Sequence, residues 1–146
     1  WMRMALDLAG NGEGRVHPNP LVGAVIVKED TVIGKGWHAY CGGLHAERNA
    51  LKDCRERGND PEGATIYVTL EPCIMCAGLM HQARVARCVY GAPDQKAGAV
   101  GTLYDIHADT RLNHQFEATG GVCEEECVAL LRDFFRARRR KEKERE

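Results

Sequence analysis

Hydrophobic residues recur along this chain with the spacings of strands and of helices in turn. Short apolar runs rich in β-branched residues predict strands. They cover residues 21–28, 31–37, 64–70 and 85–91, with a possible short last strand at 115–119. Apolar positions gathered near one face, ended by glycine or followed by polar residues, predict helices. They cover residues 2–9, 45–57, 73–84 and 124–140. Strands that alternate with helices indicate an α/β sandwich around one sheet.

Length and composition favour one globular domain. A chain of 146 residues buries roughly 70% of its unfolded surface, so its core can form without disulfides. We therefore treat residues 1–146 as a single domain. No apolar run approaches the ~20 residues of a membrane span, and we find no secretion signal. The odd count of 7 cysteines favours a reducing compartment, the cytoplasm.

Charge is balanced over the whole chain but uneven along it. The formal net charge is −1, so the molecule as a whole does not attract nucleic acid. Basic residues gather close to the C-terminus, between Arg136 and Lys141. This cluster is either a site for an anionic partner or the solvated end of a helix.

Two short segments carry candidate chemistry, each at the start of a predicted helix. The first holds His45 and the second holds Cys73 and Cys76, whose spacing places both thiols on one side of a helical turn. Two thiolates and one imidazole supply three zinc ligands and leave the fourth position open for water. Helix N-termini favour the thiolate form of the cysteines. The pattern predicts one catalytic Zn²⁺ held by His45, Cys73 and Cys76.

Glu47, two residues after His45, is the predicted catalytic proton carrier. Zinc lowers the pKa of bound water from ~15.7 towards ~7, and a nearby carboxylate can take the released proton and deliver it to a ring nitrogen. The order His-x-Glu followed by Pro-Cys-x-x-Cys is the signature of zinc-dependent nucleobase deaminases. Backbone N–H groups near Ala46 and Cys73 are candidates for stabilising the developing anion.

Two other interpretations of these segments stay open. A Cys-x-x-Cys pair in an α/β protein can be a thioredoxin-like redox centre, although His45 and Glu47 then have no role. Cys41 can also close a purely structural zinc site as a fourth ligand, although such a site has no use for Glu47.

From residue 94 onward the chain resembles bacterial tRNA-specific adenosine deaminases of the cytidine and deoxycytidylate deaminase superfamily. The matching text includes Asp94-Gln95-Lys96-Ala97-Gly98-Ala99, Gly101-Thr102-Leu103-Tyr104-Asp105 and Leu130-Leu131-Arg132-Asp133-Phe134-Phe135-Arg136. The cysteine segment, residues 69–78, belongs with it. The resemblance implies a three-layer α-β-α sandwich around a central mixed five-stranded sheet, with a cytidine-deaminase-like fold.

The stretch from residue 17 to residue 65 instead resembles the pyrimidine deaminase of riboflavin biosynthesis. The matching text is His17-Pro18-Asn19-Pro20-Leu21-Val22-Gly23, Gly36-Trp37-His38 and Gly42-Gly43-Leu44-His45-Ala46-Glu47. The tRNA enzymes have asparagine where His38 stands, and the riboflavin family has a longer spacer between its cysteines.

The tRNA resemblance implies further substrate contacts. Asn19 and His38 would border the base and ribose, and Asp94 and Lys96 would approach the sugar-phosphate of neighbouring nucleotides. Residues of the last helix would face the RNA backbone; they are Phe135, Arg136 and Arg138. The implied partners are tRNA, or another single-stranded or loop nucleic acid, and a second copy of the chain in a homodimer.

Three hypotheses of function follow. The leading one is hydrolytic deamination of adenosine to inosine at the wobble position of a tRNA anticodon loop. The second is deamination of a small free base, nucleoside or riboflavin precursor by the same zinc and glutamate. The third is a non-catalytic, zinc-stabilised RNA-binding module.

Overall fold

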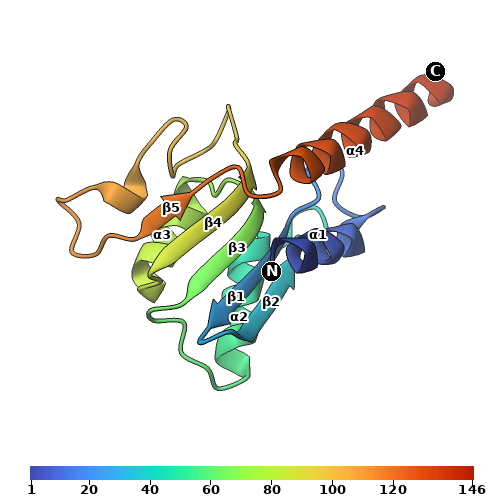
Figure 1. Ribbon diagram of the computed structural model, residues 1–146. Helices are drawn as coiled ribbons and strands as arrows, with labels where there is room; N and C mark the ends of the chain where they lie inside the picture. The colour runs from blue at the N-terminus through green and yellow to red at the C-terminus, as the bar shows by residue number, and fades with distance from the viewer.

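A mixed five-stranded sheet forms the centre of the molecule (Figure 1). The computed structural model describes residues 1–146. The strands are β1 (Gly23–Lys28), β2 (Thr31–Trp37), β3 (Thr65–Leu70), β4 (Arg87–Ala92) and β5 (Glu117–Thr119). They lie in the order β2-β1-β3-β4-β5. β1 pairs antiparallel with β2 and β3, whereas β3, β4 and β5 are parallel. The sequence-based prediction of a mixed sheet is therefore confirmed.

Helices cover both faces of this sheet, as the three-layer prediction requires (Figure 1). They are α1 (Met2–Ala9), α2 (Ala46–Glu56), α3 (Ile74–Ala83) and α4 (Glu124–Arg145), with short 3-10 turns at Gly10–Gly12 and Ile106–Ala108. Ile26 of β1 packs in the core beneath α2 and α3, while its neighbour Val25 packs in the core beneath α1 and α4. Burial on both faces explains why β1 is a continuous apolar run in the sequence.

Helix α2 lies directly on the backbone of β2. A Cβ added to Gly34 would lie 2.5 Å from the oxygen of Ala50, and one added to Gly36 would lie 2.3 Å from the nitrogen of Ala50. Only glycine allows this approach. The turn from β1 into β2 is the tight hairpin expected from the sequence, since Glu29 and Asp30 have φ of 53° and 57°.

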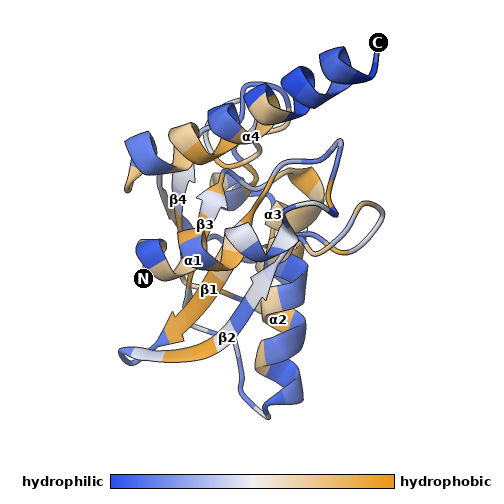
Figure 2. Ribbon diagram, turned by 90° about the vertical axis from the view of Figure 1, so that its right-hand side faces the viewer, coloured by the Kyte–Doolittle hydropathy of each residue, from blue (hydrophilic) through white to orange (hydrophobic).

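The predicted element bounds differ from the structure at several ends. β1 begins at Gly23 rather than residue 21, β4 covers 87–92 rather than 85–91, and β5 begins only at Glu117. α4 runs to Arg145, beyond the predicted end at residue 140, and extends past the edge of the sheet (Figure 1). Its last turns are strongly hydrophilic (Figure 2), so no apolar face marks this extension in the sequence. None of the helices is long and apolar enough to cross a membrane.

Candidate active site

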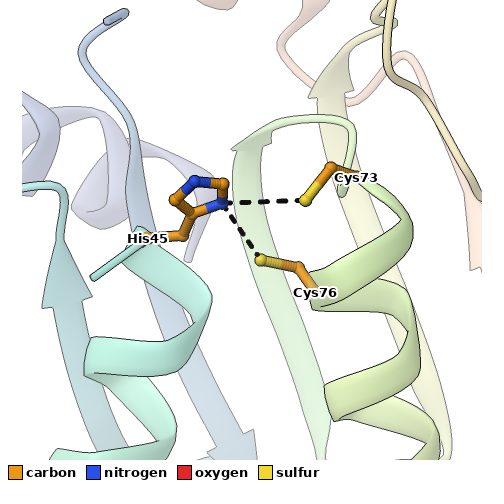
Figure 3. Close-up of side chains that lie close together, drawn as sticks. All are labelled: His45, Cys73 and Cys76. Atoms are coloured by element: carbon orange, nitrogen blue, oxygen red, sulfur yellow. Dashed lines mark hydrogen bonds between the residues drawn. The ribbon is translucent and has the colours of Figure 1, made fainter. Parts of the chain in front are cut away.

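Each of the two segments that carry the candidate chemistry supplies the N-cap residue of a helix. His45 is the N-cap of α2 and Cys73 is the N-cap of α3, both with extended backbone, so the helices begin one residue later than predicted. The two helices start at the same side of the sheet, and His45 faces Cys73 and Cys76 across the gap (Figure 3). His45 Nδ1 lies 3.7 Å from Cys73 Sγ and 3.4 Å from Cys76 Sγ.

These distances fit a tetrahedral metal ion. Zn–S bonds of about 2.3 Å and Zn–N bonds of about 2.0 Å at tetrahedral angles separate sulfur from nitrogen by roughly 3.5 Å. The ligand atoms of His45, Cys73 and Cys76 all lie within 4.8 Å of one another. Two sulfurs and an imidazole nitrogen are also the donors that zinc prefers. The three residues therefore fit one zinc ion.

The electrostatics of the cysteine pair favour a thiolate. The hydrogen bond with Cys76, followed by that with His45, lowers the pKa of the Cys73 thiol to about 4. The same hydrogen bond raises the pKa of the Cys76 thiol. The surroundings of Cys73 thus favour the thiolate, the form in which cysteine binds a metal.

Glu47 lies beside His45, Cys73 and Cys76 but is not one of the potential metal ligands. Its side chain is only 4% exposed, in the first turn of α2. Burial raises the pKa of its carboxyl to about 7. It lies outside the group of potential metal ligands but lines the same cavity as His45 and Cys73. A carboxyl in this position suits proton transfer at neutral pH.

One cavity of about 210 Å³ opens onto these residues. It is smaller than the roughly 300–1,000 Å³ typical of pockets that enclose drug-sized ligands, so a single small heterocycle suits it. The cavity brings together most of the predicted site residues. They are Asn19, His38, His45, Ala46, Glu47, Cys73 and Asp94. Cys76 is fully buried behind this lining.

Asn19 and His38 form a linked pair in the cavity wall. His38 Nδ1 lies 3.0 Å from the Leu44 carbonyl oxygen, which can only accept, so this nitrogen carries the proton. In the neutral ring Nε2 is then an acceptor, and it receives the amide N–H of Asn19 at 3.2 Å. This chain of bonds occupies the Asn19 nitrogen and leaves its oxygen as the acceptor offered to a ligand.

Comparison with known proteins identifies the family. Residues 1–92 match the model of the cytidine and deoxycytidylate deaminase zinc-binding region. The chain belongs to this deaminase family. It is a hydrolytic nucleobase deaminase, and zinc is the cofactor, as the sequence predicts. The redox-pair interpretation and the non-catalytic module are thereby set aside.

Relatives of the deaminase include both resembled enzyme types. It is 40% identical over 151 residues to a Haemophilus influenzae protein named tRNA-specific adenosine deaminase, covering 97% of this chain and 85% of that one. It also resembles a Thermotoga maritima structure described as a diaminohydroxyphosphoribosylaminopyrimidine deaminase and 5-amino-6-(5-phosphoribosylamino)uracil reductase. That match has a TM-score of 0.79 at 40% identity and covers 92% of this chain but only 39% of the Thermotoga chain.

A third relative is a structure from a study of A-to-I editing by tRNA:A34 deaminases at the wobble position. Its TM-score is 0.75 at 31% identity, with 89% of this chain and 97% of that chain covered. These likenesses confirm the expected cytidine-deaminase-like fold.

Several predicted contacts lie outside the cavity of the deaminase. Lys96 is exposed beyond the lining, next to Asp94. Arg136 is exposed on α4, Phe135 is half-buried against Phe134, and Arg138 lines a second cavity of about 330 Å³ beneath α4. The two cavities adjoin the same loop, because Pro20 lines the first and Leu21 the second. α4 is thus a neighbour of the site and not part of its wall.

The remaining chemical candidates are explained by packing. Cys41 is exposed and lies outside the ligand group, so the structure does not support a closed zinc site that includes it. His114 hydrogen-bonds to the Val85 carbonyl at 2.8 Å, in agreement with the expected loop role. Cys54, Cys88 and Cys127 are fully buried, as expected for small core residues.

The sequence did not indicate some residues of the cavity wall. They are Pro20, Val22, Leu70, Glu71 and Ala97. Of these residues only Glu71 could have been recognised from the sequence. A charged residue directly after a buried strand is unusual and needs a hydrogen-bond or ion-pair partner. The apolar wall residues look like any core position.

Proposed function

We propose that the deaminase converts adenosine to inosine in a tRNA anticodon loop, at the wobble position. The observation that carries this proposal is the extent of the likeness: 97% of the chain aligns with the Haemophilus protein. That alignment includes the C-terminal third, which carries the sequence motifs that resemble the tRNA enzymes. The short Cys-x-x-Cys spacing supports the same choice.

The size of the cavity supports a substrate base that is flipped out of the base stack of a nucleic acid. A cavity of about 210 Å³ has room for a nucleobase but not for the nucleotides on either side. Enzymes that act on a base inside nucleic acid extrude it into such a pocket, at the lowest cost where the base is unpaired. The flanking nucleotides then lie outside, near the loop of residues 16–21 and the basic part of α4.

The residues of the site divide the chemistry among them. His45, Cys73 and Cys76 would hold zinc, which supplies Lewis acidity that makes water acidic at neutral pH. Glu47 accepts a proton from the attacking water and donates it to N1 of the purine. The water oxygen bonds to C6, and Glu47 then takes the second proton from the new hydroxyl and gives it to the amine. The C6–N6 bond breaks, ammonia leaves, and C6 becomes a carbonyl. Backbone N–H groups at Ala46 and Cys73, at the starts of α2 and α3, would stabilise the developing negative charge.

A small-molecule substrate is the second candidate. The linked pair of Asn19 and His38 lies in the stretch that resembles the riboflavin pyrimidine deaminase. The likeness to the Thermotoga structure, with its TM-score of 0.79, also supports a small-molecule substrate. A free base also fits a cavity of about 210 Å³.

Inosine formation in a transcribed anticodon stem-loop decides between these candidates. The zinc-loaded protein is assayed on the stem-loop with adenosine at the wobble position, beside guanine, cytosine and the riboflavin pyrimidine precursor. We expect inosine only in the RNA. Turnover of a small substrate without any turnover of RNA would refute the proposal and establish the second candidate.

We also propose that the deaminase works as a homodimer in the cytoplasm. Four large apolar side chains near the site are about half exposed: Ile74, Met75, Leu103 and Tyr104. The hydrogen bond from Ala99 N–H to the Pro72 oxygen, 2.9 Å long, holds their two segments together. Exposed apolar residues of this size gathered by a site favour association. Met80, in the last turn of α3, and Val85, just beyond that helix, are fully buried in the core and do not belong to this patch.

A further inference from the structure

Glu71 is a buried charge without a counter-ion. It directly follows β3 and precedes the Pro72-Cys73 segment, and its side chain is only 2% exposed. None of the ion pairs in the structure includes it. A buried carboxylate of this kind is tolerated only where hydrogen bonds satisfy its oxygens.

The hydrogen bonds all come from one loop, residues 94–102. Oε1 accepts the backbone N–H of Asp94 at 3.2 Å and the hydroxyl of Thr102. Oε2 accepts the backbone N–H of Val100 at 3.2 Å and that of Thr102 at 3.1 Å. Both ends of the loop are therefore tied to one side chain, by bonds to a charged acceptor that are stronger than neutral ones.

The loop closes around the carboxylate without spare room. A Cβ added to Gly98 would lie 2.4 Å from Glu71 Oε2 and 2.6 Å from the Asp94 oxygen. Ala99 N–H donates to the Pro72 oxygen at 2.9 Å, which fixes the loop to the zinc-ligand segment. Asp94 and Ala97 of this loop line the same cavity as His38 and Asn19.

We propose that Glu71 is a positioning residue, whose carboxylate holds residues 94–102 as the wall of the base pocket. It lies outside the group of potential zinc ligands, and although it lines the cavity, both its carboxylate oxygens are engaged by the loop. Its effect on the reaction comes through the placement of Asp94 and Ala97. The kinetic consequence rests on the proposed RNA substrate, whereas the consequence for the loop does not.

The test compares Glu71→Gln with the zinc-loaded wild type, with the exposed Glu62→Gln as a matched control. A carboxamide keeps the shape but offers one acceptor oxygen, and it points N–H groups at N–H donors. We expect KM for the anticodon stem-loop to rise about tenfold while kcat falls less than about threefold. Amide hydrogen exchange at Val100 and Thr102 should become roughly tenfold faster. Zinc content should stay at one ion per chain.

A second variant covers the case in which Glu71→Gln does not fold. Gly98→Ala leaves the carboxylate in place but pushes the loop away from it, and should give the same changes in KM and exchange. Loss of zinc in proportion to activity would overturn the proposal, because Glu71 would then support the metal ligands. Unchanged exchange in both variants would also overturn it. If the wild type does not deaminate the stem-loop, the proposed function fails, while the exchange rates still decide the role of Glu71.

Discussion

The reaction centre combines residues whose tasks can be separated by single substitutions. His45, Cys73 and Cys76 lie within ligand distance of one another, whereas Glu47 is buried beside them and outside the ligand group. In the proposed function, binding of the metal and transfer of the proton would therefore belong to different side chains. A variant that loses one function should keep the other.

Glu47→Gln should remove turnover and keep the metal. The carboxamide fills the same buried space but cannot carry a proton, so we expect kcat to fall by about 10²–10⁴-fold. Metal analysis and ammonia release from the same preparation check this, with Glu62→Gln as the control. A parallel loss of zinc would show that Glu47 is a ligand after all.

At the residue scale the sequence was informative where spacing alone dictates geometry. The three-residue step from Cys73 to Cys76 and the two-residue step from His45 to Glu47 place each pair at the start of one helix, from its N-cap into its first turn. Glu71 was missed because its partners are backbone groups of residues 94–102. A sequence pattern carries no information about which distant amides a carboxylate will accept.

At the scale of elements, the site depends on how closely α2 sits on β2. The first turn of α2 carries both His45, at its N-cap, and Glu47. The helix rests on the bare backbone at Gly34 and Gly36. The distance between α2 and the sheet therefore sets the positions of the His45 and Glu47 side chains.

Gly36→Ala should destabilise the deaminase and lower its activity together. Its Cβ would lie 2.3 Å from the nitrogen of Ala50 and 2.7 Å from the oxygen of Ala46, so α2 must move. Overpacking of this kind costs about 1–3 kcal/mol of unfolding free energy. Denaturant unfolding measures it, with Gly10→Ala as the control, because that Cβ meets nothing within 4 Å. Equal stability of the two variants would contradict the argument.

The basic end of α4 should matter for RNA only. Replacing the exposed residues Arg136, Arg139 and Arg140 with acidic residues should raise KM for the stem-loop about tenfold. It should also reduce the slope of the logarithm of the binding constant against the logarithm of the salt concentration by about two. Salt titrations of stem-loop binding measure this. The matched control reverses the charges of Lys35, Lys52 and Arg55, which are exposed on β2 and α2. If both variants bind equally, α4 is a solvated helix end.

Predictability also differed among the elements. The ranges of α1 and β2 were predicted correctly, because apolar residues and glycine mark their ends. The end of α4 was wrong by five residues, since its last turns are polar on every side and helix propensity alone continues them. β5 pairs with β4 over only three residues, which is too short for an alternating apolar pattern to mark its ends.

At the scale of the whole molecule, the site lies next to an incompletely buried apolar surface. Ile74 and Met75 are on the first turn of α3, directly after Cys73. A second copy bound there would approach the mouth of the cavity. Assembly and substrate binding would then share one surface.

Light scattering at micromolar concentration should give about twice the mass of one chain. Met75→Glu should halve that mass, because it places a charge in the apolar contact. Val128→Glu is the matched control, since Val128 is also exposed but lies on α4, on the opposite face of the sheet. A monomeric wild type would refute the dimer.

The position of the zinc ligands has a consequence for folding. All 7 cysteines are free, so no disulfide links distant parts of the chain. An ion shared by His45 and Cys73 nevertheless ties together two segments that are 28 residues apart. Closing a loop of this length with a covalent link removes about 3.5 kcal/mol of unfolded-state entropy. A metal ion bound by these residues would thus also form a removable link between the starts of α2 and α3.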